Sequence, residues 1–163
     1  MTVIDQLNSC QYLYLHSIDE PKGNSVRLIL EEARSADEAE DLRIIPGAKP
    51  RLTRRIVHDD ACRIFEVVWD SYISYAVTNE SYQSEVGAET FTGRRVRRYT
   101  RSLFLGYVAR STHVADGYLG PFEHLGVICL NHGIDVVSTE APRVRLLKHG
   151  QPRPVKGPAA QRP

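Results

Sequence analysis

The segment with the clearest chemical potential is GRRVRRYTRSLFLGYVAR, residues 93–110. It contains six arginines: Arg94, Arg95, Arg97, Arg98, Arg101 and Arg110. A guanidinium group binds phosphates and carboxylates through paired hydrogen bonds, and a nearby tyrosine can stack on a nucleobase. On a helix, the basic and apolar residues of 94–110 separate onto two adjacent faces. The basic face is our candidate partner- or anion-binding site: Arg94, Arg97, Arg98 and Arg101.

The same arginines also fit an ordinary solvent-exposed face. Residues 31–41 carry six carboxylates against one arginine and offer these arginines a partner within the chain. Arginine outnumbers lysine 17 to 4 overall, so the enrichment is not peculiar to this segment. Tyr99 and Tyr107 fall on the apolar arc, which favours burial over base stacking. A protein partner is therefore favoured over nucleic acid.

Two other segments contain side chains that bind metals. HDDAC spans residues 58–62 and CLNHGID spans residues 129–135, and together they supply imidazole, thiol and carboxylate groups. Neither segment has the H-x-x-x-H, C-x-x-C or H-E-x-x-H spacing of a zinc site. Asn131 and His132 fit a turn, and Cys129 fits a buried strand. We therefore expect no metal site and no cofactor.

General acid–base chemistry is the third option. Glu66 and Asp70 share one side of an expected strand, where they are either solvated or line a cleft. The chain also contains six histidines: His16, His58, His113, His124, His132 and His149. Motifs of acyl hydrolases, P-loop NTPases and dinucleotide-binding enzymes are absent, and no motif identifies a family.

Several short elements would have to position these groups. Residues 12–18 and 26–33 predict an opening hairpin around a turn rich in proline and glycine. The apolar alternation over residues 65–77 predicts strands interrupted by a turn at Asp70 and Ser71. Residues 125–141 predict a second hairpin that turns at residues 131–133. Residues 81–93 predict a loop that ends in a helix cap at Thr92, and residues 144–147 a short last strand.

These elements predict an α+β fold, mainly antiparallel sheet built from hairpins. One principal amphipathic helix, residues 94–110, packs on that sheet. Residues 1–149 form a single globular domain. Residues 150–163 are basic and rich in proline and carry few large apolar groups, so we expect a disordered tail.

Composition narrows the class of protein. The 163-residue chain has a formal net charge of +1, so only a local patch could attract a charged partner. An odd number of cysteines without paired spacing favours reduced thiols. The start of the chain lacks a secretory pattern, and no apolar run is long enough to span a bilayer. We therefore expect a cytoplasmic protein without membrane contact.

These observations favour a small non-enzymatic protein that binds another macromolecule, in the manner of an immunity, antitoxin or accessory protein. The first alternative is nucleic-acid or polyanion binding through residues 94–110. A further alternative is an enzyme whose cleft combines dispersed histidine, aspartate and glutamate side chains. A mixed flat surface would favour the first function, a continuous basic stripe the second, and a deep polar cleft the third.

Overall fold

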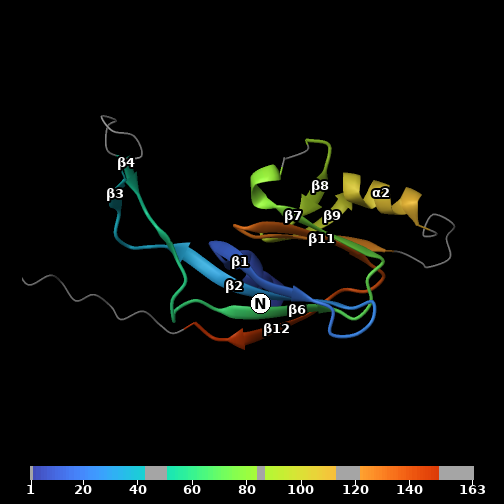
Figure 1. The fold of residues 1–163 in the computed structure, drawn as a ribbon, viewed down its shortest axis with the longest axis horizontal. Helices are drawn as coiled ribbons and strands as arrows, with labels where there is room; N and C mark the ends of the chain where they lie inside the picture. Colours follow the sequence, from blue (N-terminus) through green and yellow to red (C-terminus); the bar gives the residue numbers. More distant parts are fainter. Residues whose placement is uncertain (1, 43–50, 84–86, 113–121, 151–163) are drawn as a thin grey trace, which may run out of the picture.

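The computed structural model describes residues 2–42, 51–83, 87–112 and 122–150. Most of these residues belong to antiparallel strands, which confirms the mainly antiparallel α+β class. The strands form two principal sheets that lie face to face, as Figure 1 shows. The molecule is therefore a two-layered β-sandwich, because the two sheets bury their apolar faces against each other.

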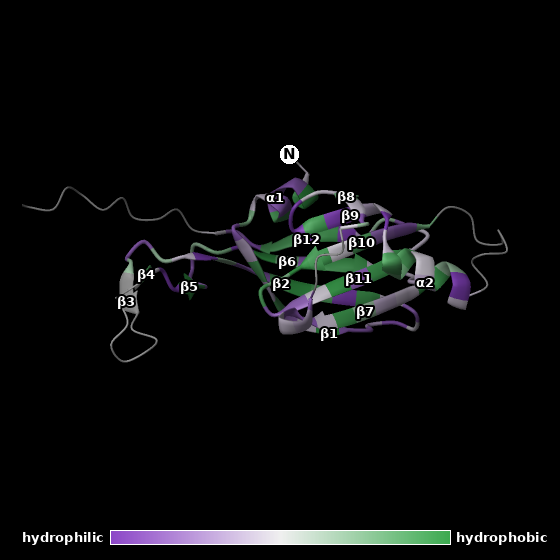
Figure 2. Ribbon diagram, turned by 90° about the horizontal axis from the view of Figure 1, so that it is seen from above, coloured by the Kyte–Doolittle hydropathy of each residue, from purple (hydrophilic) through white to green (hydrophobic). Residues whose placement is uncertain are grey.

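The first sheet contains the opening hairpin and the last strand of the described chain. Its main strands, in spatial order, are β1 (Tyr12–Asp19), β2 (Val26–Ser35), β6 (Ile64–Trp69) and β12 (Arg143–Lys148). Strand β5 (Ile56–Val57) pairs with the end of β2. Strands β3 (Glu40–Leu42) and β4 (Arg51–Thr53) pair only with each other among the described strands, and they project away from the sandwich in Figure 2.

The second sheet carries the candidate site. Its strands, in spatial order, are β7 (Ser74–Asn79), β11 (His132–Ser138), β10 (Glu123–Ile128), β9 (Val96–Arg101) and β8 (Thr90–Thr92). The helical elements are α1 (Val3–Ser9), the 3₁₀ turn η1 (Glu80–Tyr82) and α2 (Leu103–Ser111). In the described residues, no helix has the length and apolar character needed to cross a membrane.

The core lies between the two sheets and follows the alternation of their strands. Val26, Leu28 and Leu30 point inward from β2 and are fully buried. Phe65 and Trp69 extend this layer from β6. The second sheet contributes side chains from β9, β10 and β11: Val96, Leu125, Val127, Ile134 and Val136. Alternate residues of these three strands consequently face outward, away from the core.

Two predicted hairpins are confirmed, and one turn was placed wrongly. Strands β1 and β2 pair directly, as do β10 and β11. The second turn consists of residues 129–131, whereas His132 and Gly133 already belong to β11. Asn131 is needed elsewhere: its side-chain amide donates to the backbone oxygen of Leu15 and accepts from the backbone nitrogen of the same residue, each at 3.0 Å. This contact ties the second sheet to β1.

The predicted break near Asp70 is also confirmed, with a larger consequence than a tight turn. Strand β6 ends at Trp69 in the first sheet, and β7 begins at Ser74 in the second. Residues 70–73 therefore carry the chain from one layer to the other. The expected last strand is present as β12. The expected disordered tail, from residue 151 onward, lies outside the described residues.

The predicted single helix over residues 94–110 is wrong in its first half. Val96–Arg101 is strand β9, between β10 and β8, and only Leu103–Ser111 is helical. The expected cap at Thr92 is likewise wrong, because Thr90–Thr92 is strand β8 and Ser102 caps α2. Tertiary pairing overrides the helical spacing here, since both neighbours of β9 bond its backbone.

Candidate functional site

An open pocket of about 830 Å³ lies on the outer face of the second sheet. Its floor comes from β9, β10 and β11, and its walls come from α2, β8 and η1. The lining residues, grouped by chemistry, are the aromatic and apolar Tyr82, Phe91, Tyr99, Leu103, Phe104 and Ile128, the charged Glu80, Glu89, Arg97 and Asp135, and Thr78, Gln83 and Gly87. A concave site that combines apolar walls with a few polar groups is the usual form of a binding site.

Two glycines, one in β10 and one in β11, lie where there is no room for a side chain. Gly126 pairs with Asp135 across β10 and β11. A Cβ atom at Gly126 would lie 2.8 Å from Cε2 of Tyr99 and 3.3 Å from Oδ1 of Asp135. At Gly133, a Cβ atom would lie 1.4 Å from Nε2 of Gln83. Neither position therefore accepts a side chain without displacing residues that line the pocket.

A chain of hydrogen bonds runs beside the pocket from α2 to Asp135. The backbone nitrogen of Leu105 donates to Ser102 Oγ at 2.9 Å, which caps the helix. Ser102 Oγ lies 2.7 Å from His124 Nδ1, and His124 Nε2 lies 2.9 Å from Asp135 Oδ1. A neutral imidazole protonated at Nε2 satisfies both ends, since Ser102 then donates to Nδ1 and Nε2 donates to Asp135.

The His124 ring in this hydrogen-bond chain is also packed between other side chains. His124 is only 1% exposed. Tyr99 stacks on it with ring centroids 4.3 Å apart, and Phe104 approaches it at 5.5 Å. The pKa of the Tyr99 hydroxyl is raised, mainly by burial and further by the carboxylates of Asp135 and Glu89, whereas the Arg97 guanidinium opposes this shift. The Asp135 and Glu89 carboxylates thus disfavour an anion at this position.

Serine, histidine and aspartate are also the residues of a nucleophilic triad, but the arrangement differs from one. In a triad the serine faces the substrate and the aspartate lies behind the histidine. Here Asp135 lines the pocket and its side chain is 30% exposed, whereas Ser102 and His124 do not line it. Ser102 Oγ is already the helix cap. The geometry fits a chain that positions Asp135 and α2 rather than an activated serine.

The rim of the pocket exposes large apolar side chains. Tyr82 is 82% exposed and Leu103 is 61% exposed, and both line the pocket. Tyr107 lies one helical turn after Leu103, on the same face of α2, and is 59% exposed. Phe91, from β8, adds a fourth exposed apolar side chain. Clustered exposed apolar groups with a polar floor are typical of an interaction site.

The four arginines of the predicted face are separated by the strand. Arg97 and Arg98 are neighbours on β9, and consecutive strand residues point to opposite sides. Arg97 faces the pocket, where its guanidinium lies 4.2 Å from the centre of the Phe91 ring. Arg98 Nη1 bonds Glu123 Oε1 at 2.5 Å.

The other two arginines lie at either end of β9. Arg94 precedes the strand and Arg101 ends it, and both are exposed. The structure therefore brings only one of the four, Arg97, into the pocket. The neighbouring Arg95 has a structural role: its guanidinium stacks over Tyr12 and bonds the backbone oxygen of Gln11.

The two segments considered for metal binding lie apart: residues 58–62 form the loop between β5 and β6, and residues 129–135 belong to the second hairpin. His58 Nδ1 lies 2.8 Å from the backbone oxygen of Glu32, and Asp59 pairs with Arg34 beside the first sheet. Cys129 belongs to the second hairpin, and burial raises the pKa of its thiol to about 12. Across the described residues, no three histidine, cysteine, aspartate or glutamate side chains are grouped for a metal ion.

Glu66 and Asp70, the two carboxylates considered for acid–base chemistry, are held separately. Glu66 is buried and accepts from Arg145 Nε at 2.7 Å, so the first of the two alternatives, a solvated side chain, is wrong for this residue. Asp70 is exposed and takes two bonds from Arg143, whose guanidinium lowers the pKa of that carboxyl. Both arginines come from β12, the strand that pairs with β6 in the first sheet.

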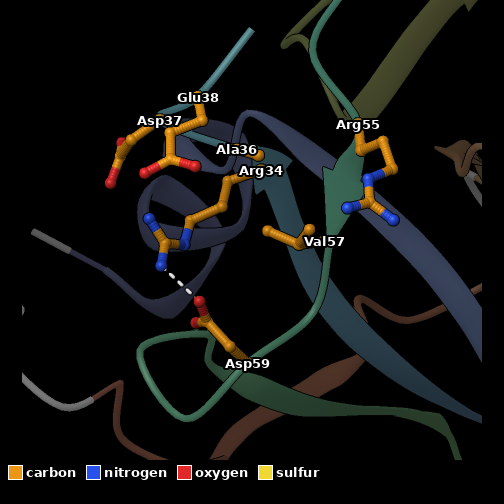
Figure 3. Close-up of a pocket in the computed structure, with 7 residues that line it drawn as sticks. All are labelled: Arg34, Ala36, Asp37, Glu38, Arg55, Val57 and Asp59. Carbon is orange, nitrogen blue, oxygen red and sulfur yellow. Dashed lines mark hydrogen bonds and ion pairs between the residues drawn. The ribbon is translucent and has the colours of Figure 1, made fainter. Parts of the chain in front are cut away.

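A smaller pocket of about 260 Å³ lies at the base of the β3–β4 extension (Figure 3). Arg34 bonds Asp59 there, and Val57 lies between Arg34 and Arg55 in the close-up. The remaining lining residues are Ala36, Asp37 and Glu38. Its size is at the lower limit for a ligand site, and its charged groups already have partners. The pocket on the second sheet is the stronger candidate.

Sequence reasoning named His124, Asp135 and Arg97 but did not place them together. It did not single out Ser102, Tyr82, Glu89 or Phe91. One signal was available: Ser102 directly precedes an apolar run, which is the pattern of a helix N-cap. That pattern would have started the helix at Leu103. Comparison with known proteins adds nothing to this site, because no family model, curated protein or solved structure matches the chain.

Proposed function

We propose that this protein binds another protein through the pocket and rim on the outer face of its second sheet. The observation that supports this proposal is a group of exposed apolar side chains: Tyr82, Phe91 and Leu103 line the pocket, and Tyr107 lies one turn further along α2. Exposed aromatic residues beside a pocket are the usual anchors of a protein interface. The polar floor at Asp135 supplies the directional contacts that give such an interface its specificity.

Site-directed photo-crosslinking tests this function. Replacing Tyr82 by p-benzoylphenylalanine places the photoreactive group on the rim, and the same replacement at Leu147 places it on β12 of the first sheet. Leu147 is 50% exposed and serves as the matched control. We expect a crosslinked protein from the native cell at position 82 and none at position 147.

The crosslinked protein is then purified and its binding measured by calorimetry. Replacing Leu103 and Tyr107 together by alanine should weaken binding at least about tenfold, because both are exposed anchors. Leu147→Ala should leave the affinity unchanged. Equal crosslinking at positions 82 and 147 would contradict the proposal. Labelling of Ser102 by a fluorophosphonate probe would instead identify an enzyme.

A further inference from the structure

The pocket has an excess of negative charge. It is lined by three carboxylates, Glu80, Glu89 and Asp135, and by one guanidinium, that of Arg97. The three carboxylates come from η1, from the loop before β8 and from β11, so they surround the pocket rather than follow one element. This charge is unusual for the chain, whose formal net charge is +1.

Each of these carboxylates is fixed by a bond to the protein. Glu89 Oε1 accepts the backbone nitrogen of Leu103 at 3.0 Å. Glu80 Oε2 accepts the hydroxyl of Ser81 at 3.3 Å. Asp135 Oδ1 accepts from His124, and within the described residues its Oδ2 has no hydrogen-bond partner. The floor of the pocket therefore offers a fixed carboxylate oxygen to a ligand.

The aromatic side chains that line the pocket also suit a cationic ligand. Phe91 already carries the Arg97 guanidinium over its ring at 4.2 Å, which shows that this wall accepts a planar cation. Tyr82 also lines the pocket and is 82% exposed, so its ring is free to stack. A guanidinium group combines stacking on aromatic rings with paired bonds to a carboxylate, whereas the ammonium of lysine is a point charge.

We infer that the pocket receives an arginine side chain from a segment of the partner protein, with Asp135 as its carboxylate and Tyr82 as a stacking ring. This inference rests on the proposed function, because it names the chemistry of the partner. Its direction is the reverse of the sequence-based expectation, in which arginines of this chain bind an acidic partner. Asp135 is then the residue that sets specificity, and His124 is the residue that positions it.

NMR titration with two small probes tests this inference. N-acetyl-arginine methylamide carries the guanidinium, and N-acetyl-citrulline methylamide is its neutral counterpart of nearly the same shape. We expect the arginine probe to shift the amide signals of Gly126 and Asp135, with an affinity on the order of millimolar for so small a ligand. The citrulline probe should bind at least about tenfold more weakly, because it lacks the charge.

Two variants locate the binding site. Asp135→Asn keeps an oxygen for His124 and removes the charge, and it should weaken the arginine probe about tenfold or more. Tyr82→Ala should weaken it several-fold, and because Tyr82 is so exposed this variant remains informative if Asp135→Asn does not fold. Glu140→Gln removes an exposed charge outside the pocket and should have no effect.

The outcomes separate this inference from the proposed function. Absence of binding by the arginine probe, equal binding of citrulline, or binding unaffected by both pocket variants would each overturn the arginine assignment. Crosslinking at position 82 would still stand as support for a protein interface. Conversely, binding of the arginine probe without any crosslinked protein would leave a cation site and remove the protein partner.

Discussion

Ser102 joins two parts of the candidate site with one hydroxyl group. It accepts the backbone nitrogen of Leu105 as the cap of α2, and it lies 2.7 Å from Nδ1 of the buried His124. A cap alone contributes about 1 kcal/mol. Here a second cost follows from its removal, because the Nδ1 atom of an imidazole that is 1% exposed loses its hydrogen-bond partner. The residue thus matters for both the wall and the floor of the pocket.

The first prediction concerns this double role. Ser102→Ala should lower the free energy of unfolding by about 2–3 kcal/mol, the sum of a lost cap and a buried nitrogen left unpaired. Urea denaturation followed by circular dichroism measures the loss. Ser111→Ala is the matched control in the same helix, because Ser111 Oγ bonds the exposed carbonyl oxygen of Tyr107. It should change stability by less than about 0.5 kcal/mol. Equal free energies of unfolding for the two variants would show that the hydrogen bond between Ser102 and His124 contributes nothing to stability.

At the scale of elements, the chain from β9 to α2 shows what sequence alone could and could not predict. Val96, Tyr99, Leu103, Phe104 and Tyr107 satisfy a helical spacing across a boundary that the structure places at Ser102. The first two of these residues belong to β9 and the last three to α2, so the helical spacing arises from two different elements. Hydrophobic period cannot detect such a boundary, whereas the cap residue can. The hairpins were predictable because their pairing partners are neighbours in sequence.

The start of β9 depends on a contact far away in the sequence. Asn8 Oδ1 accepts the backbone nitrogens of Arg94, Arg95 and Val96 at 2.9, 2.8 and 3.0 Å. Gly93 precedes them with φ of 92°, and a Cβ atom there would lie 2.0 Å from the backbone oxygen of Val96. One amide side chain of α1 therefore fixes where β9 begins. No local pattern in residues 93–110 encodes this contact.

The second prediction tests that anchor. Asn8→Ala should destabilise the protein by about 1–3 kcal/mol, because three backbone donors lose their acceptor. Asn8→Asp keeps the oxygen at the same position and should cost clearly less. Thermal unfolding measures both, and amide hydrogen exchange at Val96 should accelerate only in the alanine variant. Equal loss in the two variants would mean that Asn8 acts through packing rather than through its oxygen.

At the scale of the whole molecule, the two sheets share one core. The alternation of apolar residues identifies the buried face of each strand, but it does not identify which sheet packs against that face. The apolar alternation over residues 65–77 agrees with the burial of Phe65 and Trp69. The patterns did not show that β6 and β7 belong to different layers, because the apolar pattern of a strand's buried face is the same whichever sheet packs against it. The site had the same limitation: its pocket combines residues from Thr78 to Asp135, and no local segment contains it.

The last prediction follows from this shared core. Trp69 is 1% exposed in the first sheet, and within the described residues its Nε1 has no hydrogen-bond partner. Trp69→Ala should therefore cost about 3–5 kcal/mol through lost burial and an internal cavity, with no polar partner left behind. Trp69→Phe keeps a ring in the same place and should cost much less.

Because one core serves both sheets, the alanine variant should still unfold in a single transition. Far-UV circular dichroism reports all strands, and the NMR amide signals of Ile134 and Val136 report β11 of the second sheet. Their urea midpoints should fall together. Native amide signals of β11 that persist after the far-UV signal has begun to change would mean that the second sheet, with its pocket, folds independently of the first.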